Sequence, residues 1–324
     1  MLNNTFFLFP GQGAQFPGMA LDLLEGGGES VGRVFSLASE IFGKDMIDLL
    51  RNSSPEELKA TDVSQPAITL ANLAAAAYLA EKGLKPGGAA GFSLGEYSAL
   101  AAAGVISVED CLSLVARRGE VMQAAIDRIN EKSKKANDPR PPGMAAVIGL
   151  APEQVEALIA GWKKDGLTDL NAANINSPKQ VAVSGSAAAL EEAEKRFKEA
   201  GAKRFMRLQV AGPYHSPFMK EAAAEFDAHL DKIRFNDPVI PIFSNVTGKQ
   251  IHSGEEAKAL AHRHILEGVR WTDEEAALAS LQPEALLEVG PGKVLQGLWK
   301  DSGSAIPCYG AGTAAEINAL LNTQ

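Results

Sequence analysis

Short apolar runs alternate with longer helical patterns in the first 130 residues. The runs at residues 6–10 (FFLFP) and 87–92 (GGAAGF) are continuous and end at turns, which is typical of buried parallel strands. The stretches at residues 65–83, 94–104 and 107–129 carry the glycine stop or the capping pair expected of helices. Strands that alternate with helices predict an α/β fold with a parallel sheet.

The pattern changes after residue 129. Residues 130–142 (NEKSKKANDPRPP) are charged and proline-rich, and they predict an exposed loop or hinge. Residues 143–207 then follow a β-α-β-α-β order, with room for a further strand near residues 167–174, which resembles a ferredoxin-like insert. Residues 208–324 return to helices and short strands. We therefore expect a large domain from residues 1–142 and 208–324, and a small domain from residues 143–207.

Composition adds limits to this picture. The chain is 46% hydrophobic and 22% charged, as in ordinary globular proteins. Its net charge of −9 argues against broad nucleic-acid binding. Cys111 and Cys308 have no disulfide or zinc spacing, which favours a reducing, cytoplasmic compartment. No apolar stretch reaches the roughly 18 residues of a membrane span, and the first residues lack the basic segment of a signal peptide, so we expect no membrane partner.

The sequence GFSLG, residues 91–95, fits the pattern G-x-S-x-G. It follows a predicted strand and precedes a predicted helix, and in that context the glycines permit a sharp turn that exposes the serine hydroxyl. Ser93 is therefore a candidate nucleophile. The alternative is that Ser93 only caps the start of the helix.

A serine nucleophile needs a general base, and the chain has five histidines. His215 lies in the loop VAGPYHSPFM between a predicted strand and a predicted helix, where catalytic groups are commonly placed. His229 lies within a predicted helix and His252 in a polar turn. His262 and His264 lie in AHRHILEG, which is typical of a surface helix. We therefore expect His215 to be the base.

Two further groups have the chemistry of an acyl-transfer site. Arg118 lies on the apolar stripe of its predicted helix, about 100° from Arg117. It therefore either meets an anionic group inside the protein or extends past the stripe to the surface. Gln12 lies in the glycine-rich turn FPGQGAQFPGM, which lacks the spacing of a nucleotide-phosphate loop. Its backbone N–H is a candidate donor to an oxyanion.

Several motifs follow one another in the order found in one enzyme family. From about residue 6 to residue 300 the chain resembles malonyl-CoA:acyl carrier protein transacylases and the related polyketide-synthase acyltransferases. The resemblance implies an α/β-hydrolase-like large domain with a parallel sheet, an inserted ferredoxin-like small domain, and a cleft between them. The motifs that carry it are FPGQGAQFPGM, GFSLGEYSALAAAG, ARRGEVMQ, NINSPKQVAVSG, GAKRFMRL, GPYHSPFM, PIFSNVTG and EVGPGKVLQGL.

The resemblance also implies roles for individual residues. Ser93 would be the nucleophile and His215 its general base and acid, while Gln12 and Leu94 would supply the N–H groups of the oxyanion hole. Arg118 would bind the malonyl carboxylate. The remaining implied positions are Asn176, which would line the cleft, and Lys203 and Arg204, near which the phosphates of coenzyme A or of the carrier protein would approach.

The chain departs from the family pattern at three positions. Phe92 replaces the histidine of the usual GHSLG, so a polar contact to the acyl group or the pocket wall is lost. His264 stands where the family has a glutamine whose main-chain carbonyl faces the base. Tyr214 precedes His215 where malonyl-selective members commonly have phenylalanine. Catalysis should survive these changes, whereas the acyl selectivity becomes uncertain.

The predicted function is transfer of malonyl from malonyl-CoA to the phosphopantetheine thiol of acyl carrier protein, for fatty acid biosynthesis. We expect a monomer that needs no metal or redox cofactor. One alternative is a polyketide-pathway acyltransferase or an editing acyl hydrolase, although Arg118 argues against hydrolysis of uncharged acyl groups. Another is a non-catalytic module that docks a carrier protein, against which Ser93, His215 and Arg118 argue together.

Overall fold

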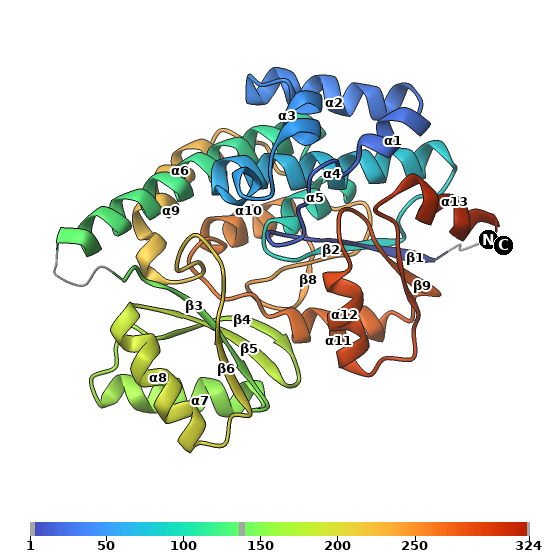
Figure 1. The fold of residues 1–324 in the computed structure, drawn as a ribbon. Coiled ribbons are helices and arrows are strands. Elements are labelled where there is room, and N and C mark those ends of the chain that lie inside the picture. Colours follow the sequence, from blue (N-terminus) through green and yellow to red (C-terminus); the bar gives the residue numbers. More distant parts are fainter. Residues whose placement is uncertain (1–3, 136–139, 323–324) are drawn as a thin grey trace.

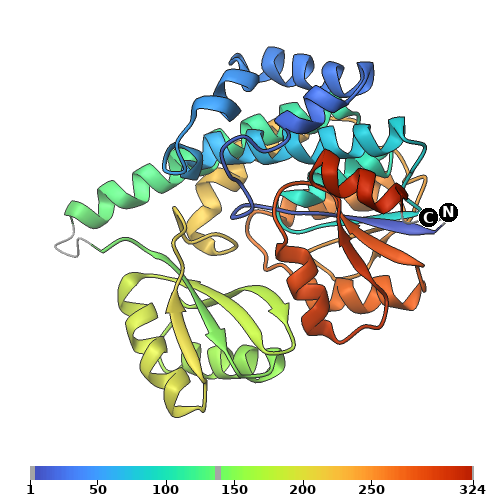
Figure 2. The same ribbon diagram turned by 45° about the vertical axis from the view of Figure 1, so that its right-hand side comes forward.

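The computed structural model describes residues 4–135 and 140–322 of the chain. Within these residues the strands form two sheets, one of six strands and one of four, each with helices packed beside it (Figure 1). The larger sheet is built from the first and last thirds of the chain, and the smaller one from the middle. The turned view separates the smaller sheet and its two helices, in green to yellow, from the rest of the molecule (Figure 2).

The six-stranded sheet has the order β10-β9-β1-β2-β7-β8. Every neighbouring pair is parallel except β7 and β8, which are antiparallel. The predicted parallel sheet is therefore present, with one antiparallel edge strand. Its strands are β1 (Thr5–Phe9), β2 (Gly88–Gly91), β7 (Ile242–Phe243), β8 (Gln250–Ile251), β9 (Ala285–Glu288) and β10 (Cys308–Gly310).

The continuous apolar run of β1 is explained by burial on both faces of this sheet. Phe7 and Phe9 belong to the large core that also contains helix residues, whereas Phe6 and Leu8 belong to a second core on the opposite face. Successive side chains of a strand point to opposite faces. A central strand that is covered on both faces is therefore apolar throughout, without alternation of apolar and polar residues.

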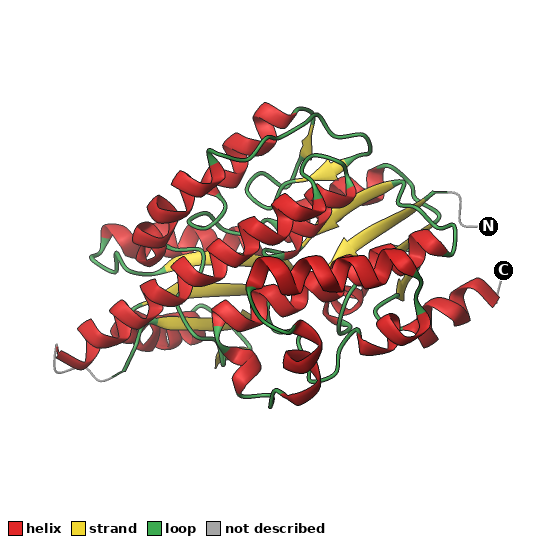
Figure 3. Cartoon of the chain, turned by 90° about the horizontal axis from the view of Figure 1, so that it is seen from above, coloured by secondary structure: helices red, strands yellow, loops and turns green. Residues whose placement is uncertain are grey.

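Helices cover this sheet, and seen from above they lie over the strands (Figure 3). The long α4 and α6 pack against each other. Two short 3₁₀ segments precede helices: η1 (Glu57–Lys59) lies just before α4, and η2 (Pro217–Met219) lies directly before α9. The helices of this part are α1 (Leu21–Gly26), α2 (Glu29–Phe42), α3 (Met46–Asn52), α4 (Thr61–Glu81), α5 (Gly95–Ala102), α6 (Val108–Lys135), α9 (Lys220–Leu230), α10 (Gly254–Arg263), α11 (Trp271–Ser280), α12 (Val294–Ser302) and α13 (Ala314–Asn322).

The four-stranded sheet has the order β4-β5-β3-β6, and all of its pairs are antiparallel. Its core contains apolar side chains from the strands and from α7 and α8, among them Val147, Val155 and Phe197. The further strand that the sequence left room for is β4. The elements are β3 (Gly143–Ile148), α7 (Pro152–Lys164), β4 (Asn171–Ser177), β5 (Gln180–Gly185), α8 (Ala187–Glu199) and β6 (Arg204–Arg207).

Backbone hydrogen bonds join the two parts of the molecule beside β4. The Ile175 N–H donates to the Val269 carbonyl at 2.8 Å, and the Val269 N–H donates to the Ala173 carbonyl at 2.8 Å. An ion pair of 3.2 Å between Arg270 and Glu156 of α7 lies next to them. The segment after α10 is therefore fixed to the smaller sheet.

Two predicted boundaries are wrong. The predicted loop 130–142 begins too early, because α6 continues to Lys135; residues 136–139 of that loop lie outside the described residues. Residues 130–135 are charged, and a helix whose buried face ends near Ile126 continues into solvent without needing apolar residues. Helix α4 begins at Thr61 rather than at residue 65, and Pro66 lies inside it.

Candidate active site

Ser93 lies on a sharp turn between β2 and α5. Its backbone has φ of 49°, in the left-handed region that residues with a side chain rarely adopt. A Cβ atom on Gly91 would overlap the backbone of Gly95, and one on Gly95 would overlap the Phe9 carbonyl. The two glycines of G-x-S-x-G are thus required by close packing of the strand end against the helix start. The turn presents the Ser93 hydroxyl at the carboxyl end of β2.

The Ser93 hydroxyl is hydrogen-bonded to His215. Oγ lies 2.9 Å from Nε2 of His215, and Nδ1 of the same ring lies 2.8 Å from the Glu267 carbonyl oxygen. A carbonyl only accepts hydrogen bonds, so Nδ1 carries the proton and Nε2 is free to accept one from Ser93. The geometry therefore matches a serine with its general base.

Burial keeps this imidazole neutral. Desolvation lowers the pKa of His215 to about 3, and the nearby His264 and Arg118 act in the same direction. The carbonyl of Glu267 partly opposes them by favouring the protonated ring. At neutral pH the ring is thus in the form that accepts a proton.

Arg118 is buried, whereas its neighbour Arg117 is half-exposed and forms ion pairs with Glu120 and Glu225. The guanidinium of Arg118 lies over the Tyr97 ring, 5.6 Å from its centroid. Among the described residues, its Nε and Nη1 have no hydrogen-bond partner. A buried cation with free donors is costly unless an anion meets it. The site is therefore suited to an anionic ligand group.

A cavity of about 160 Å³ brings most of the predicted site residues together. The Oδ1 atom of Asn176 on its wall is buried and has no partner within the described part of the chain. Tyr214 is held by a 2.7 Å hydrogen bond between its hydroxyl and that of Thr61. The predicted residues on the wall are Gln12, Phe92, Ser93, Arg118, Asn176, Tyr214 and His215; Met122, Met144, Asn174, Ala182, Leu208 and Val210 complete it.

Two backbone N–H groups lie beside the Ser93 turn. A Cβ on Gly11 would overlap the Phe92 carbonyl, so the loop that carries Gln12 packs directly against the turn. The Gln12 side chain is anchored to α4, because it donates to Ser64 at 3.0 Å and accepts from Gln65 at 3.1 Å. Among the described residues, neither the Gln12 N–H nor the Leu94 N–H donates to a backbone carbonyl.

Comparisons with known proteins agree with this geometry. Residues 6–311 match the family model described as acyl transferase domain. The malonyl CoA-acyl carrier protein transacylase of Haemophilus influenzae is 37% identical over 316 residues, which cover 97% of this chain and 96% of that protein. The chain belongs to the acyl transferase domain family.

Solved structures of similar proteins extend the likeness to three dimensions. The MCAT of Streptococcus pneumoniae has a TM-score of 0.90 and 32% identity, and the match covers 99% of this chain and 100% of that one. A malonyl-transacylase solved in complex with a type II polyketide acyl-carrier protein has a TM-score of 0.87 and 34% identity, with coverage of 99% and 100%.

In this acyl transferase domain, His264 is placed differently from the sequence expectation. Residues 261–268 are predicted to form a surface helix, yet the His264 side chain is only 1% exposed. Helix α10 ends at Arg263, and the His264 ring turns inward to lie 5.9 Å from the ring of His215. The carbonyl 2.8 Å from Nδ1 of His215 belongs to Glu267. The main chain of His264, the position expected from the resemblance, also interacts with His215 and raises its pKa, but less than Glu267 does.

Three other predicted residues do not line the cavity. Lys203 and Arg204 are exposed at the start of β6, an edge strand of the smaller sheet. Leu94 is buried, and only its backbone faces the turn. Lys203 and Arg204 thus lie at the surface and outside the cavity.

Sequence reasoning missed Asn245 and Glu267, which are hydrogen-bonded to Ser93 and His215 of this acyl transferase domain. Asn245 Oδ1 accepts from the Ser93 N–H at 2.6 Å, and the Glu267 carbonyl accepts from His215. Asn245 was detectable, because it is the last residue of PIFSN, predicted as a short strand, and polar residues at strand ends commonly form sites. Glu267 acts through its main chain, which leaves no signal in the side-chain pattern.

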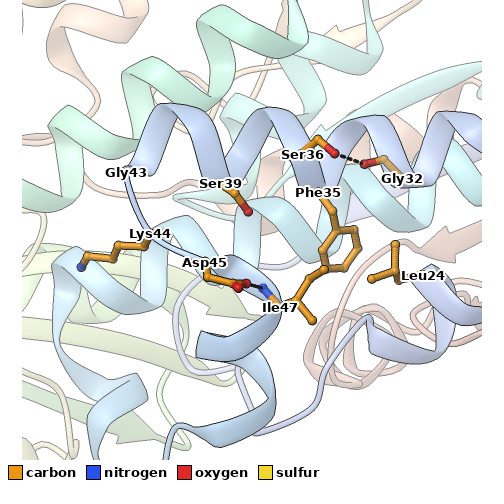
Figure 4. Close-up of a pocket in the computed structure, with 9 residues that line it drawn as sticks. All are labelled: Leu24, Gly32, Phe35, Ser36, Ser39, Gly43, Lys44, Asp45 and Ile47. Atoms are coloured by element: carbon orange, nitrogen blue, oxygen red, sulfur yellow. Dashed lines mark hydrogen bonds between the residues drawn. The ribbon is translucent and has the colours of Figure 1, made fainter.

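A larger hollow of about 680 Å³ lies elsewhere, between α2 and α3. Figure 4 shows residues that line it, among them Phe35, Lys44, Asp45 and Ile47. None of the predicted site residues lines it. Among residues 4–135 and 140–322, no helix is long and apolar enough to span a membrane, and no group of three or more His, Cys, Asp or Glu is arranged to hold a metal ion.

Proposed function

We propose that this acyl transferase domain moves a malonyl group from malonyl-CoA to the phosphopantetheine thiol of an acyl carrier protein. The observation that carries the proposal is the common cavity of Ser93, His215 and the buried Arg118, whose Nε and Nη1 have no partner among the described residues. The names of the relatives, malonyl CoA-acyl carrier protein transacylases, support the same substrates.

In the first half-reaction, Ser93 Oγ attacks the thioester carbonyl while Nε2 of His215 takes its proton. The N–H groups of Gln12 and Leu94 stabilise the negative oxygen of the tetrahedral intermediate. Collapse of the intermediate breaks the C–S bond. The coenzyme A thiolate leaves with the proton from His215, and Ser93 carries the malonyl ester.

In the second half-reaction, His215 takes the proton of the phosphopantetheine thiol and the thiolate attacks the Ser93 ester. The C–O bond breaks, and the proton returns from His215 to Ser93 Oγ. The thioester substrate already holds the activated acyl group, so the proposed reaction uses no metal or redox cofactor.

Arg118 binds the carboxylate of the malonyl group through its planar fork of donors. This pairing satisfies a buried cation and discriminates against acyl groups without a carboxylate. Asn176 and Tyr214 provide polar atoms on the same wall. Phe92 lies edge-on to Trp271, with ring centroids 5.4 Å apart, and makes the remaining wall apolar.

The proposal extends to the domain organisation. The sheet order β4-β5-β3-β6 with antiparallel pairs supports a ferredoxin-like small domain for residues 143–207. The parallel sheet with a serine turn at the end of β2 supports an α/β-hydrolase-like domain for residues 1–142 and 208–324. A cytoplasmic location and a monomeric state are further proposals.

Service in a polyketide pathway is the second candidate. It is favoured by the similar transacylase solved with a type II polyketide acyl-carrier protein, and by Phe92 in place of the usual histidine. The acyl group that the protein transfers, malonyl or methylmalonyl, shows its selectivity. A Phe92→His variant that folds and changes the ratio of malonyl to methylmalonyl transfer would assign selectivity to this position.

The proposed function is tested by mass spectrometry of the intact protein after exposure to malonyl-, methylmalonyl- and acetyl-CoA. We expect one malonyl adduct on the wild type and none on Ser93→Ala, because the turn presents no other nucleophile. A malonyl adduct of normal yield on Ser93→Ala would contradict the assignment. Absence of any adduct on the wild type would leave the docking module as the better interpretation.

A further inference from the structure

The side chain of Asn245 spans the turn that carries Ser93. Its Oδ1 accepts from the Ser93 N–H at 2.6 Å, and its Nδ2 donates to the Gly91 carbonyl at 2.7 Å. The two contacted groups lie on opposite sides of residue 92, where the strand becomes the turn. One amide thus fixes both arms of the turn.

The turn needs such support. Ser93 has φ of 49°, and a residue with a side chain keeps this conformation only when its surroundings hold it. The Ser93 N–H donates its hydrogen bond to Asn245, which does not line the cavity, and it is therefore occupied. The N–H of the next residue, Leu94, is then the one left to face the reacting carbonyl.

Asn245 is itself fixed from three directions. Its N–H donates to Glu96 Oε2 at 2.8 Å, its carbonyl accepts from the Arg270 N–H at 2.8 Å, and its Nδ2 also donates to Glu274 Oε1 at 2.7 Å. Glu96 belongs to α5, the helix that follows the nucleophile, and Glu274 belongs to α11. The position of the amide is therefore set by both helices and by the segment that contacts the smaller sheet.

We infer that Asn245 is a positioning residue, which holds the main chain of Ser93 in the conformation that aims Oγ at His215. The inference rests on the proposed function. Asn245 is 1% exposed and is absent from the cavity wall, so it acts through Ser93 and does not touch the substrate. An amide fits this position, because it offers both an acceptor for the Ser93 N–H and a donor for the Gly91 carbonyl.

Two substitutions separate these contacts. Asn245→Ala removes both, whereas Asn245→Asp keeps an acceptor for the Ser93 N–H and loses the donor to Gly91 when it is ionised. Asp45→Ala is the control, since Asp45 likewise accepts from two backbone N–H groups but does so at the start of α3, far along the chain from the site.

Each variant is treated with malonyl-CoA in single-turnover experiments and, separately, with diisopropyl fluorophosphate. In the second reaction Ser93 Oγ forms a bond to phosphorus, fluoride leaves, and His215 takes the hydroxyl proton. The end point counts folded protein with a competent serine, and the rate constant reports how well the serine is aimed. A purely structural role would lower the end point or the melting temperature and leave the rate constant unchanged.

For Asn245→Ala we expect both rate constants to fall about tenfold to a hundredfold, the loss typical of a misplaced reacting group, with KM for malonyl-CoA within about twofold. Asn245→Asp should fall less, and Asp45→Ala should keep the wild-type rate constants. If one Asn245 variant does not fold, the other decides.

Wild-type rate constants in the folded Asn245 variants would overturn the inference, and so would failure of both variants to fold. Failure of the wild type to react with malonyl-CoA would contradict the proposed function instead. The fluorophosphate rates would then still decide the role of Asn245.

Discussion

Arg118 is a buried guanidinium whose Nε and Nη1 have no hydrogen-bond partner among the described residues. A hydrogen bond to a charged group is worth about 1.5–3 kcal/mol, so Arg118→Ala should lower kcat/KM for malonyl-CoA by about tenfold to a hundredfold. Acetyl-CoA has no carboxylate, and its kcat/KM should be maintained or rise. Steady-state kinetics with the two substrates measures the difference.

Arg117→Ala is the matched control for this prediction, because Arg117 is adjacent in sequence but forms ion pairs at the surface. It should change neither value by more than about twofold, as expected of a surface ion pair. Equal losses with both substrates in Arg118→Ala would instead assign Arg118 to support of the fold.

The pH dependence of acylation is a second prediction at this scale. Burial lowers the pKa of His215 to about 3, so the ring is the neutral base throughout the mildly acidic range. The rate of malonyl-enzyme formation should therefore stay level as the pH falls below the ordinary histidine pKa of about 6.5. His264 contributes to this lowering, and His264→Gln should move the acid limb to higher pH.

The lowered pKa of His215 also makes the folded protein less stable at acidic pH. Below the ordinary pKa the unfolded chain binds a proton at His215 that the folded chain does not, so this group lowers the free energy of unfolding as the pH falls from about 6.5 toward 3. Two measurements are made at each pH: the rate of acylation after rapid mixing, and the free energy of unfolding in urea. Together they distinguish protonation of His215 from unfolding of the protein. A fall in the acylation rate near pH 6.5, while the protein is still folded, would contradict the lowered pKa of His215.

At the scale of elements, the junction of β1, β2 and α5 allows the serine turn to exist. A Cβ at Gly95 would overlap the Phe9 carbonyl of β1, so Gly95→Ala should force α5 away from the sheet. We expect a loss of about 1–3 kcal/mol in the free energy of unfolding, as for other overpacked sites, and a loss of acylation. Urea unfolding and single-turnover kinetics measure the two effects.

Gly161→Ala is the control for the glycine effect itself. Gly161 lies inside α7, where an added Cβ meets nothing within 4 Å. Alanine is the better helix former, and this variant should gain up to about 1 kcal/mol without a change in rate. Wild-type stability in Gly95→Ala would show that the helix start moves without strain.

At the scale of the whole molecule, the two sheets and their helices meet at the cavity, and we expect charge to influence how a carrier protein approaches it. The chain carries −9, and an acidic carrier protein would be repelled by most of its surface. Lys203 and Arg204 are exposed on the edge strand β6. Lys203→Glu with Arg204→Glu should raise KM for the carrier protein more than KM for malonyl-CoA.

The wild-type KM for the carrier protein should also rise with salt, because screening weakens contacts between exposed charges. Lys44→Glu with Arg51→Glu makes the same change in net charge on and beside α3 and serves as the control. Equal KM values for the two double variants, together with transfer that is independent of salt, would contradict an interaction of the carrier protein with Lys203 and Arg204.

The sequence by itself determined the parts of this protein that depend on local chemistry. Local features of this kind depend on a few residues that are adjacent in sequence. They are the apolar run of β1, the glycines around Ser93 and the loop around His215. Periodicity also placed Arg118 on the inward stripe of α6, because the 3.6-residue repeat distinguishes it from Arg117.

Only the tertiary structure decided what depends on segments far apart in the chain. Asn245 is separated from Ser93 by 152 residues and Glu267 from His215 by 52, and no local pattern encodes such contacts. Burial of His264 likewise depends on distant residues that pack against the end of α10, such as Tyr97 and His215. A helix end, a main-chain carbonyl and an asparagine after a strand are ordinary features in sequence, and they become part of the site only where the folded chain brings them to Ser93 and His215.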